Sequence, residues 1–168
     1  MIRVRDITLI AIFTALLFIQ EQILSFIPNV QLTFFLLILY SKKLKFINSF
    51  IICFIYVLLD NLLTISSYPI FIPFMLIGWL IIPITINTIF KKVESNVCLA
   101  LLGILFSLVY SWSLIIPGCI LFNMKFITYL KGDIIYELLL MISSFITILI
   151  LYNPCSKIFD RYVKKEIK

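Results

Sequence analysis

The chain has 168 residues, of which 63% are hydrophobic and only 13% are charged. This composition excludes an ordinary soluble domain, because so few polar side chains cannot cover a globule in water. The net charge is +6, but the basic residues lie in short segments beside long apolar runs, so lipid headgroups and membrane topology explain them without a nucleic-acid partner.

The apolar runs predict the fold class. Most are about 20 residues long, the length that crosses the hydrocarbon core of a bilayer as a helix. Backbone polar groups in lipid must be satisfied inside each span, which favours helices over open sheets. We therefore predict an all-α, polytopic membrane protein with six transmembrane helices in one bundle. No linker divides the chain, so residues 1–168 form a single integral membrane domain.

The first predicted span covers residues 7–27. No cleavage pattern followed by a soluble domain accompanies it, so we interpret it as a retained helix rather than a signal peptide. The second span, residues 30–40, reaches only about 18 Å and is too short to cross the membrane alone. Either the turn at Pro28–Gln31 enters the membrane or the flanking lysines snorkel to its surface. Short or broken segments are common places for a transporter site.

The third predicted span covers residues 46–64, and the fourth covers residues 70–90. Pro73 is expected to open the fourth helix, and Pro83 is expected to kink it.

The last two predicted spans cover residues 97–116 and 134–152. Pro117-Gly118 is expected to bend or end the fifth helix, and an outer loop over residues 123–133 leads to the sixth. Asn153-Pro154 is expected to break the sixth helix. The basic tail, residues 156–168, is then predicted to be a cytoplasmic amphipathic extension, with Ile158, Phe159 and Tyr162 against the membrane.

The positions of the basic residues predict the orientation. If the N-terminus is cytoplasmic, twelve of the 14 Lys and Arg residues lie inside, and only Lys125 and Lys131 lie outside. The positive-inside rule therefore places both termini in the cytoplasm. We expect a multi-pass protein of the cell membrane, specifically a bacterial plasma membrane.

Four acidic residues fall on the outer side of this topology: Glu21, Asp60, Asp133 and Glu137. Because acidic residues contribute little to topology, their clustering favours a binding layer. Glu21 interrupts an otherwise apolar helix, so it either lines a cavity or reaches the headgroups. Asp133 and Glu137 lie one turn apart, and a cationic ligand or a salt bridge to Lys131 would offset their repulsion.

Aromatic residues accompany the outer acids. Trp79 and Trp112 lie well inside their spans, and Tyr136 lies near the outer interface. An interfacial belt is the usual role of Trp and Tyr in membrane proteins. The alternative is a pocket in which aromatic faces and carboxylates hold a cation or a flat heterocycle. The predicted substrate-binding residues are Glu21, Asp60, Trp79, Trp112, Tyr136 and Glu137.

Several classes of function lack their signature. The chain has no histidine, which excludes His-dependent membrane proteases and phosphatases. Its four cysteines have no C-x-x-C spacing, so neither a metal site nor a disulfide framework is expected. There is no Walker A loop. We predict a protein that is not an enzyme, with no metal and no cofactor bound by this chain.

Six spans in so short a chain, with the N-terminal segment Arg3-Val4-Arg5-Asp6 and the pattern Ala11-x-x-x-Ala15, resemble the S component of energy-coupling factor (ECF) transporters. The resemblance implies capture of a small organic vitamin or precursor, cationic or heteroaromatic, from outside. It also implies a partner ECF module, consisting of a transmembrane coupling subunit and two ATPases that use ATP. Ala11 and Ala15 would dock on the coupling subunit. Lack of histidine departs from the nickel and cobalt members.

Two other classes share this layout. A membrane scaffold similar to the rod-shape-determining MreD proteins would use its polar residues as partner contacts and would need no outward-facing cavity. A small ion-coupled transporter would use its carboxylates as proton or sodium sites. No inverted repeat of broken helices supports the second alternative.

Overall fold

The computed structural model describes residues 4–27, 29–63 and 68–163, and within these ranges it contains helices and no strand. The elements are α1 (Val4–Leu24), α2 (Thr33–Lys43), α3 (Phe46–Leu63), a short 3-10 helix η1 (Pro69–Phe71), α4 (Ile72–Thr88), α5 (Asn96–Phe122) and α6 (Phe126–Tyr162). All of these helices except η1 and the 11-residue α2 are long and apolar enough to cross a membrane. The predicted all-α fold and the multi-pass membrane class are confirmed.

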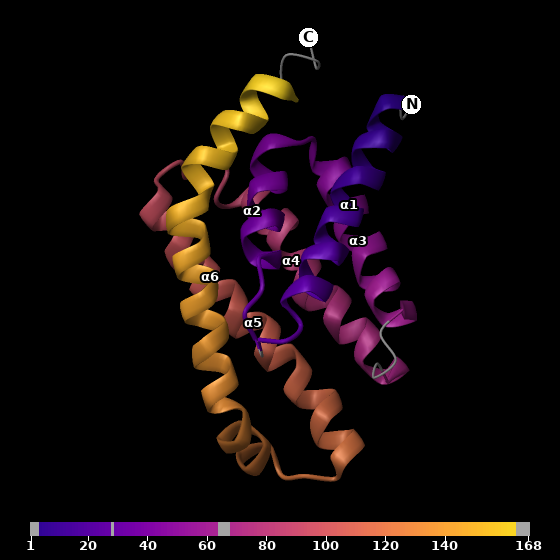
Figure 1. Ribbon diagram of the computed structural model, residues 1–168. Helices are drawn as coiled ribbons and strands as arrows, with labels where there is room; N and C mark the ends of the chain where they lie inside the picture. The colour runs from indigo at the N-terminus through magenta and orange to yellow at the C-terminus, as the bar shows by residue number, and fades with distance from the viewer. Residues whose placement is uncertain (1–3, 28, 64–67, 164–168) are drawn as a thin grey trace.

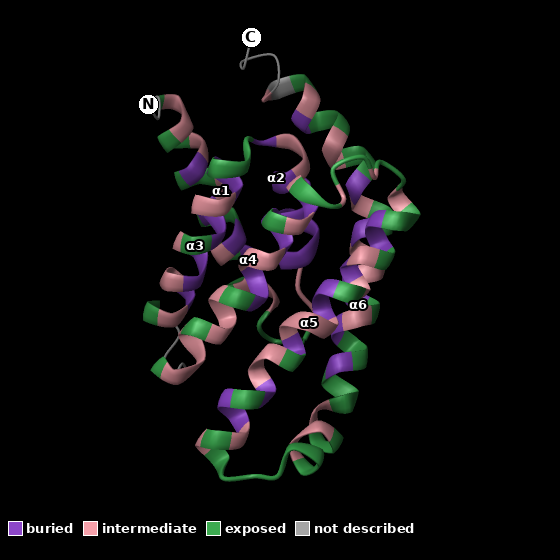
Figure 2. Cartoon of the chain, turned by 180° about the vertical axis from the view of Figure 1, so that it is seen from behind, coloured by how far each residue is buried: buried purple, intermediate pink, exposed green. Residues whose placement is uncertain are grey.

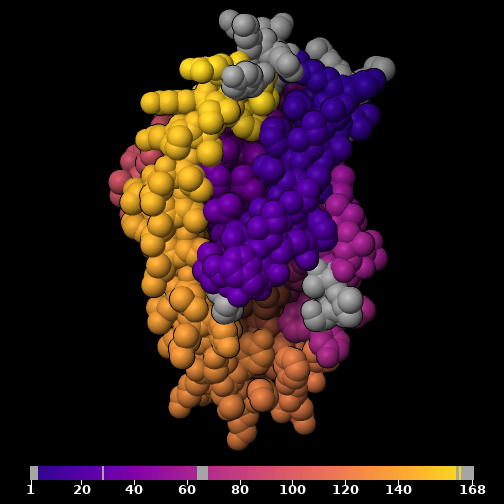
Figure 3. All heavy atoms as spheres, in the orientation of Figure 1, coloured from indigo at the N-terminus to yellow at the C-terminus, as the bar shows by residue number. Residues whose placement is uncertain are grey.

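The helices run up and down in one bundle, and α1 begins at the end of the molecule where α6 finishes (Figure 1). We call this the basic end, because lysines and arginines from several elements make contacts there. Arg5 donates to the Val163 carbonyl, and Lys43 pairs with Asp160 at 2.6 Å. The opposite end carries the α1–α2 and α5–α6 connections, and we call it the acidic end. There α5 and α6 project beyond the α1–α2 connection (Figures 1 and 3).

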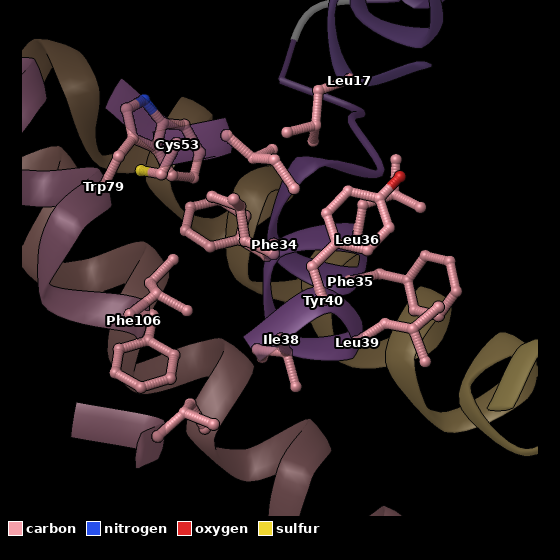
Figure 4. Packing of buried hydrophobic residues seen from close by; sticks show 14 of the residues in the cluster. Leu17, Phe34, Phe35, Leu36, Ile38, Leu39, Tyr40, Cys53, Trp79 and Phe106 are labelled. Carbon is pink, nitrogen blue, oxygen red and sulfur yellow. The ribbon is translucent and has the colours of Figure 1, made fainter. Parts of the chain in front are cut away.

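Helix α2 lies at the centre of the bundle and packs against all five of the long helices. Every residue from Thr33 to Ser41 is buried, as the purple ribbon in Figure 2 shows. Its side chains point outward in all directions into the core, where Phe34 faces Trp79 and Phe35 lies on the other side (Figure 4). Eleven residues of helix reach roughly 16 Å, about half of a hydrocarbon core. The short predicted second span is therefore a core helix, enclosed by its neighbours.

A single glutamine orders the start of α2. Gln20 of α1 is buried, and its Oε1 atom accepts a hydrogen bond from the backbone N–H of Leu32 at 2.9 Å. Its amide nitrogen donates to the Thr33 hydroxyl at 2.8 Å. Because the first N–H groups of a helix have no partner inside the helix, this contact caps α2 from a neighbouring element. It also holds the α1–α2 connection at the acidic end.

The fifth and sixth helices differ from their predicted limits. Helix α5 continues through Pro117 to Phe122, and Asn123 ends it with a left-handed backbone (φ 51°). Helix α6 starts at Phe126, so the predicted outer loop over residues 123–133 is wrong. The predicted break at Asn153-Pro154 is also wrong, because α6 continues to Tyr162. Packing against neighbouring helices supports a proline inside a membrane helix and offsets its missing hydrogen bond.

Other expectations about helix ends meet different outcomes. Pro73 lies in the first turn of α4, as predicted. The turn at Pro28–Gln31 is described only from Asn29 onward, and the last part of the basic tail, residues 164–168, lies outside the described residues, so the expectations for these segments remain predictions. The predicted place of Phe159 against the membrane is wrong, because its ring is buried and stacks on Phe13 of α1 at 5.2 Å.

Candidate functional site: an acidic cavity

A cavity of about 480 Å³ opens at the acidic end of the bundle, bounded by the α1–α2 connection and by α1, α3, α5 and α6. Its volume falls in the range of small-molecule sites. The polar residues of its walls are Glu21, Gln22, Ser25, Asn29, Gln31, Asp60, Tyr110, Ser111, Tyr129 and Asp133. Carboxylates from three helices therefore face the same space.

The wall made by α1 and α3 contains two of the predicted residues. The Tyr56 hydroxyl donates to Glu21 Oε2 at 2.5 Å, and the Tyr56 side chain is almost completely buried. Asp60 lies one turn after Tyr56 and is only 7% exposed. It is close enough to Glu21 for the two carboxylates to interact electrostatically. The structure thus brings together Glu21 and Asp60, which are 39 positions apart in the sequence.

The opposite wall is built by α5 and α6. The Ser111 hydroxyl of α5 donates to Asp133 Oδ2 of α6 at 3.1 Å. Tyr129 lies beside Asp133, and its ring rests on the backbone of Gly118. A Cβ atom at position 118 would lie 2.5 Å from carbon atoms of that ring, so glycine permits the close contact. This contact sets the position of Tyr129 in the cavity wall.

Glu137 is the fourth predicted acid, and it lies one turn after Asp133 on α6. It is 6% exposed, and among the described residues its Oε1 atom has no hydrogen-bond partner. Glu137 is not among the residues that line the cavity, although Asp133 and Leu140, which lie on the same stripe of α6, are. A buried carboxylate oxygen with no donor costs free energy, which a donor or a cation beside it would offset.

The α1–α2 connection closes one side of the cavity. Asn29 adopts a left-handed backbone (φ 56°), which asparagine tolerates better than most residues. Its amide nitrogen donates to the Tyr136 carbonyl of α6 at 2.9 Å. This hydrogen bond joins the connection to the far wall, and Val30 and Gln31 line the cavity beside it.

The three predicted aromatic residues have different positions. Trp79 is buried behind the cavity wall, where its ring lies 4.2 Å from that of Tyr110 and 4.7 Å from that of Phe34. Trp112 is 57% exposed and Tyr136 is 47% exposed, and neither side chain lines the cavity. Trp79 therefore supports Tyr110 from the second layer, whereas the other two rings face outward.

The helical repeat explains which residue of α5 lines the cavity. Tyr110, Ser111 and Leu114 share one face of α5, and successive residues turn by about 100°. Trp112 lies about 200° around the helix from Tyr110, outside the arc that holds the other three residues, and so points away from the cavity. Sequence reasoning identified the acids and missed the contributions of Ser111 and Asn29, because a serine or asparagine in an apolar run has no charge to mark it. Ser111 is adjacent to Trp112, which was predicted to bind the substrate, but this proximity did not indicate which face of α5 lines the cavity.

The predicted docking residues lie at a distance from the cavity. Ala11 and Ala15 are both exposed on α1, among apolar side chains such as Ile12 and Leu16. In Figure 3 the atoms of α1 form one face of the molecule. A small-residue pattern on an exposed helix allows a second helix to approach closely.

No group of three or more potential metal ligands occurs among the described residues. Comparison of the chain with protein-family models, curated proteins and solved structures finds no significant match.

Proposed function

We propose that this protein is the substrate-binding subunit of an ECF-type importer, which captures a small organic micronutrient from outside the cell and delivers it through an ATP-driven partner module. The observation that carries the proposal is the cavity of about 480 Å³ at the acidic end. Its carboxylates, hydroxyls and rings from four segments of the chain supply the fixed polar groups and apolar walls that a small-molecule site requires.

The cavity favours this proposal over a membrane scaffold of the MreD type. A scaffold has no need of Glu21, Asp60 and Asp133 converging on one open cavity, because carboxylates within an apolar bundle cost free energy, and a binding site for a ligand would explain their presence. Partner contacts of a scaffold belong on the outer surface instead.

The charge distribution supports the direction of capture. Most of the described basic residues lie at the basic end, with Lys125 and Lys131 at the acidic end as the exceptions, and the positive-inside rule assigns the basic end to the cytoplasm. The cavity then opens to the outside. This chain has no nucleotide-binding loop, so the proposal assigns ATP hydrolysis to partner subunits.

The test is to identify a ligand of the detergent-purified full-length protein. Mass spectrometry of released small molecules provides candidates, and thermal unfolding with a panel of vitamins and precursors tests them. A ligand at 100 times its dissociation constant stabilises the protein by about 2.7 kcal/mol. Glu21→Gln should reduce the affinity, whereas Glu94→Gln at the exposed basic end should not.

Absence of any ligand response, together with copurification of cell-shape proteins, would contradict the proposal and favour the scaffold.

A further inference from the structure

A second cavity lies between α1, α2 and α6, nearer the basic end of the bundle. Its volume is about 230 Å³, and none of its lining residues also lines the acidic cavity. Its walls include Phe13 and Leu16 of α1 and Ile158 and Phe159 of α6, and its floor includes Leu39 and Tyr40 of α2. We call it the apolar groove. Figure 4 shows Leu39 and Tyr40 on the side of α2 away from Trp79.

The apolar groove opens sideways, toward the lipid that surrounds a membrane bundle. Leu16 is 46% exposed and Ile158 is 59% exposed, one on each wall. Figure 3 shows atoms of α2, in purple, between α1 and α6. In a bilayer, apolar walls that are open on this side contact lipid chains rather than water. An α-helix is about 10 Å across, so a space of this volume admits an acyl chain or a side chain and not a helix.

Apolar walls alone do not hold a lipid, because lipid tails are as apolar as leucine and gain little by entering the groove. A bound lipid needs a polar contact, and Tyr40 offers one. Tyr40 is 1% exposed, and its hydroxyl has no hydrogen-bond partner among the described residues. Its ring lies 4.7 Å from that of Phe13 and 6.4 Å from that of Phe159. A buried hydroxyl without an acceptor costs free energy, and an ester carbonyl of a lipid would supply the acceptor.

Positive charge lies beside the apolar groove at the basic end. Arg5 donates to the Val163 carbonyl at 3.4 Å, and Val163 lines the groove. Arg161, two residues before Val163, is exposed and forms no salt bridge with another described residue. The carboxylate of Asp160 is paired with Lys43 instead. Basic pockets between transmembrane helices on the cytoplasmic side are typical sites for acidic lipid headgroups.

We propose that the apolar groove binds one acyl chain of an anionic phospholipid from the leaflet at the basic end. The Tyr40 hydroxyl donates to an ester carbonyl of this lipid, and Arg5 and Arg161 attract its phosphate. The inference concerns a site separate from the acidic cavity and does not rest on the proposed transport function.

The test compares two lipids with the same tails and different headgroups. Dioleoyl phosphatidylglycerol and dioleoyl phosphatidylcholine are titrated onto the delipidated full-length protein, and native mass spectrometry measures the dissociation constants. Phosphatidylglycerol should bind at least about fivefold tighter, the gain expected for one basic side chain near an acidic headgroup. Equal affinities for the two lipids would overturn the proposal.

Variants of the walls locate the bound chain. Leu16→Trp and Ile158→Trp fill the apolar groove from opposite walls, at residues exposed enough to accept the larger ring. Each should weaken phosphatidylglycerol binding at least about tenfold. Leu101→Trp adds the same ring to α5, where Leu101 is 54% exposed and lies outside the groove, and should change nothing. Melting temperatures identify any variant that does not fold.

Variants of the polar groups test the two anchors. Tyr40→Phe should weaken the binding of both lipids by about twofold to tenfold, because both have ester carbonyls. Arg5→Gln should weaken phosphatidylglycerol binding and leave phosphatidylcholine binding nearly unchanged. Lys92→Gln removes an exposed charge at the same end, outside the groove, and should affect neither lipid.

The remaining outcomes decide what occupies the groove. Unchanged phosphatidylglycerol binding in a folded tryptophan variant of either wall would overturn the proposal. A wild-type dimer that becomes a monomer in Leu16→Trp would assign the groove to a second copy of the chain and would also overturn it. If neither wall variant folds, Tyr40→Phe decides, and unchanged binding of both lipids in that variant contradicts the site.

Discussion

The cavity depends on a few side chains that make polar contacts within an apolar bundle. The hydroxyl of the buried Tyr56 side chain is the donor for Glu21, which is half-buried in the cavity wall. Loss of a donor from the buried side of this carboxylate costs more than loss at an exposed site, since solvent does not replace it there.

Tyr56→Phe should therefore lower the free energy of unfolding by about 1–3 kcal/mol, because it leaves the Glu21 carboxylate without its buried donor. Thermal unfolding in detergent measures the change. Tyr68→Phe is the matched control, since Tyr68 is 52% exposed and should tolerate loss of its hydroxyl. Equal melting temperatures for the two variants would show that the Tyr56 hydroxyl contributes nothing to stability.

At the scale of the elements, the structure depends on contacts that position one helix by another. Helix α2 is too short to cross the bilayer, so its N-terminal end lies within the protein, where its backbone groups need partners. Gln20 of α1 supplies such a partner at the N-terminal end.

Gln20→Ala should destabilise the protein by about 1–3 kcal/mol, because the Leu32 N–H loses its acceptor and the buried Thr33 hydroxyl loses the donor that Gln20 supplies. Gln22→Ala, in the same helix but exposed, should change stability by no more than about 0.5 kcal/mol. Denaturation of the two variants side by side measures the difference. A Gln20→Ala protein as stable as Gln22→Ala would argue against the capping contact.

The close contact of α5 with α6 leads to a second prediction at this scale. Gly118→Ala places a methyl group 2.5 Å from the Tyr129 ring, so the ring must move and the cavity wall must change. We expect a loss of stability of about 1–3 kcal/mol and weaker ligand binding. Gly132→Ala is the control on α6, since no atom lies within 4 Å of its added Cβ. Unchanged binding in Gly118→Ala would show that Tyr129 has no role in the site.

For the whole molecule, the two ends differ in charge and in proposed role. The basic end joins α1, α2, α6 and the connection between α4 and α5 through hydrogen bonds and a salt bridge, and the acidic end contains the cavity. The orientation of the ends in the membrane decides whether the cavity can capture a solute from outside.

Cysteine labelling tests this orientation. In a variant whose four native cysteines are replaced, Lys131→Cys should react with a membrane-impermeant maleimide in intact cells, whereas Lys92→Cys should react only after permeabilisation. Both positions are exposed, so access depends on the side of the membrane. The reverse labelling pattern would place the cavity on the cytoplasmic side.

Docking to a partner module also concerns the whole molecule. Replacing Ala11 or Ala15 with leucine should abolish uptake and leave ligand affinity unchanged, because these exposed residues lie far from the cavity wall. Ile12→Phe adds bulk at an exposed neighbour outside the alanine pattern and should retain uptake. Normal transport by Ala15→Leu would contradict the docking assignment.

Membrane class, the helical fold and the approximate positions of the helices follow from the sequence, because span length and charge are local properties of the chain. The separation of basic and acidic ends follows for the same reason. The acids at residues 21 and 60 were recognised because a carboxylate in an apolar helix is conspicuous.

Only the tertiary structure decided which face of each helix lines the cavity. In a membrane helix the lipid-facing and interior faces are both apolar, so hydropathy does not distinguish Ser111, inside, from Trp112, outside. The same packing decided that α2 is an enclosed core helix and that α6 continues past Pro154, since neighbouring helices supply contacts that the local sequence does not record.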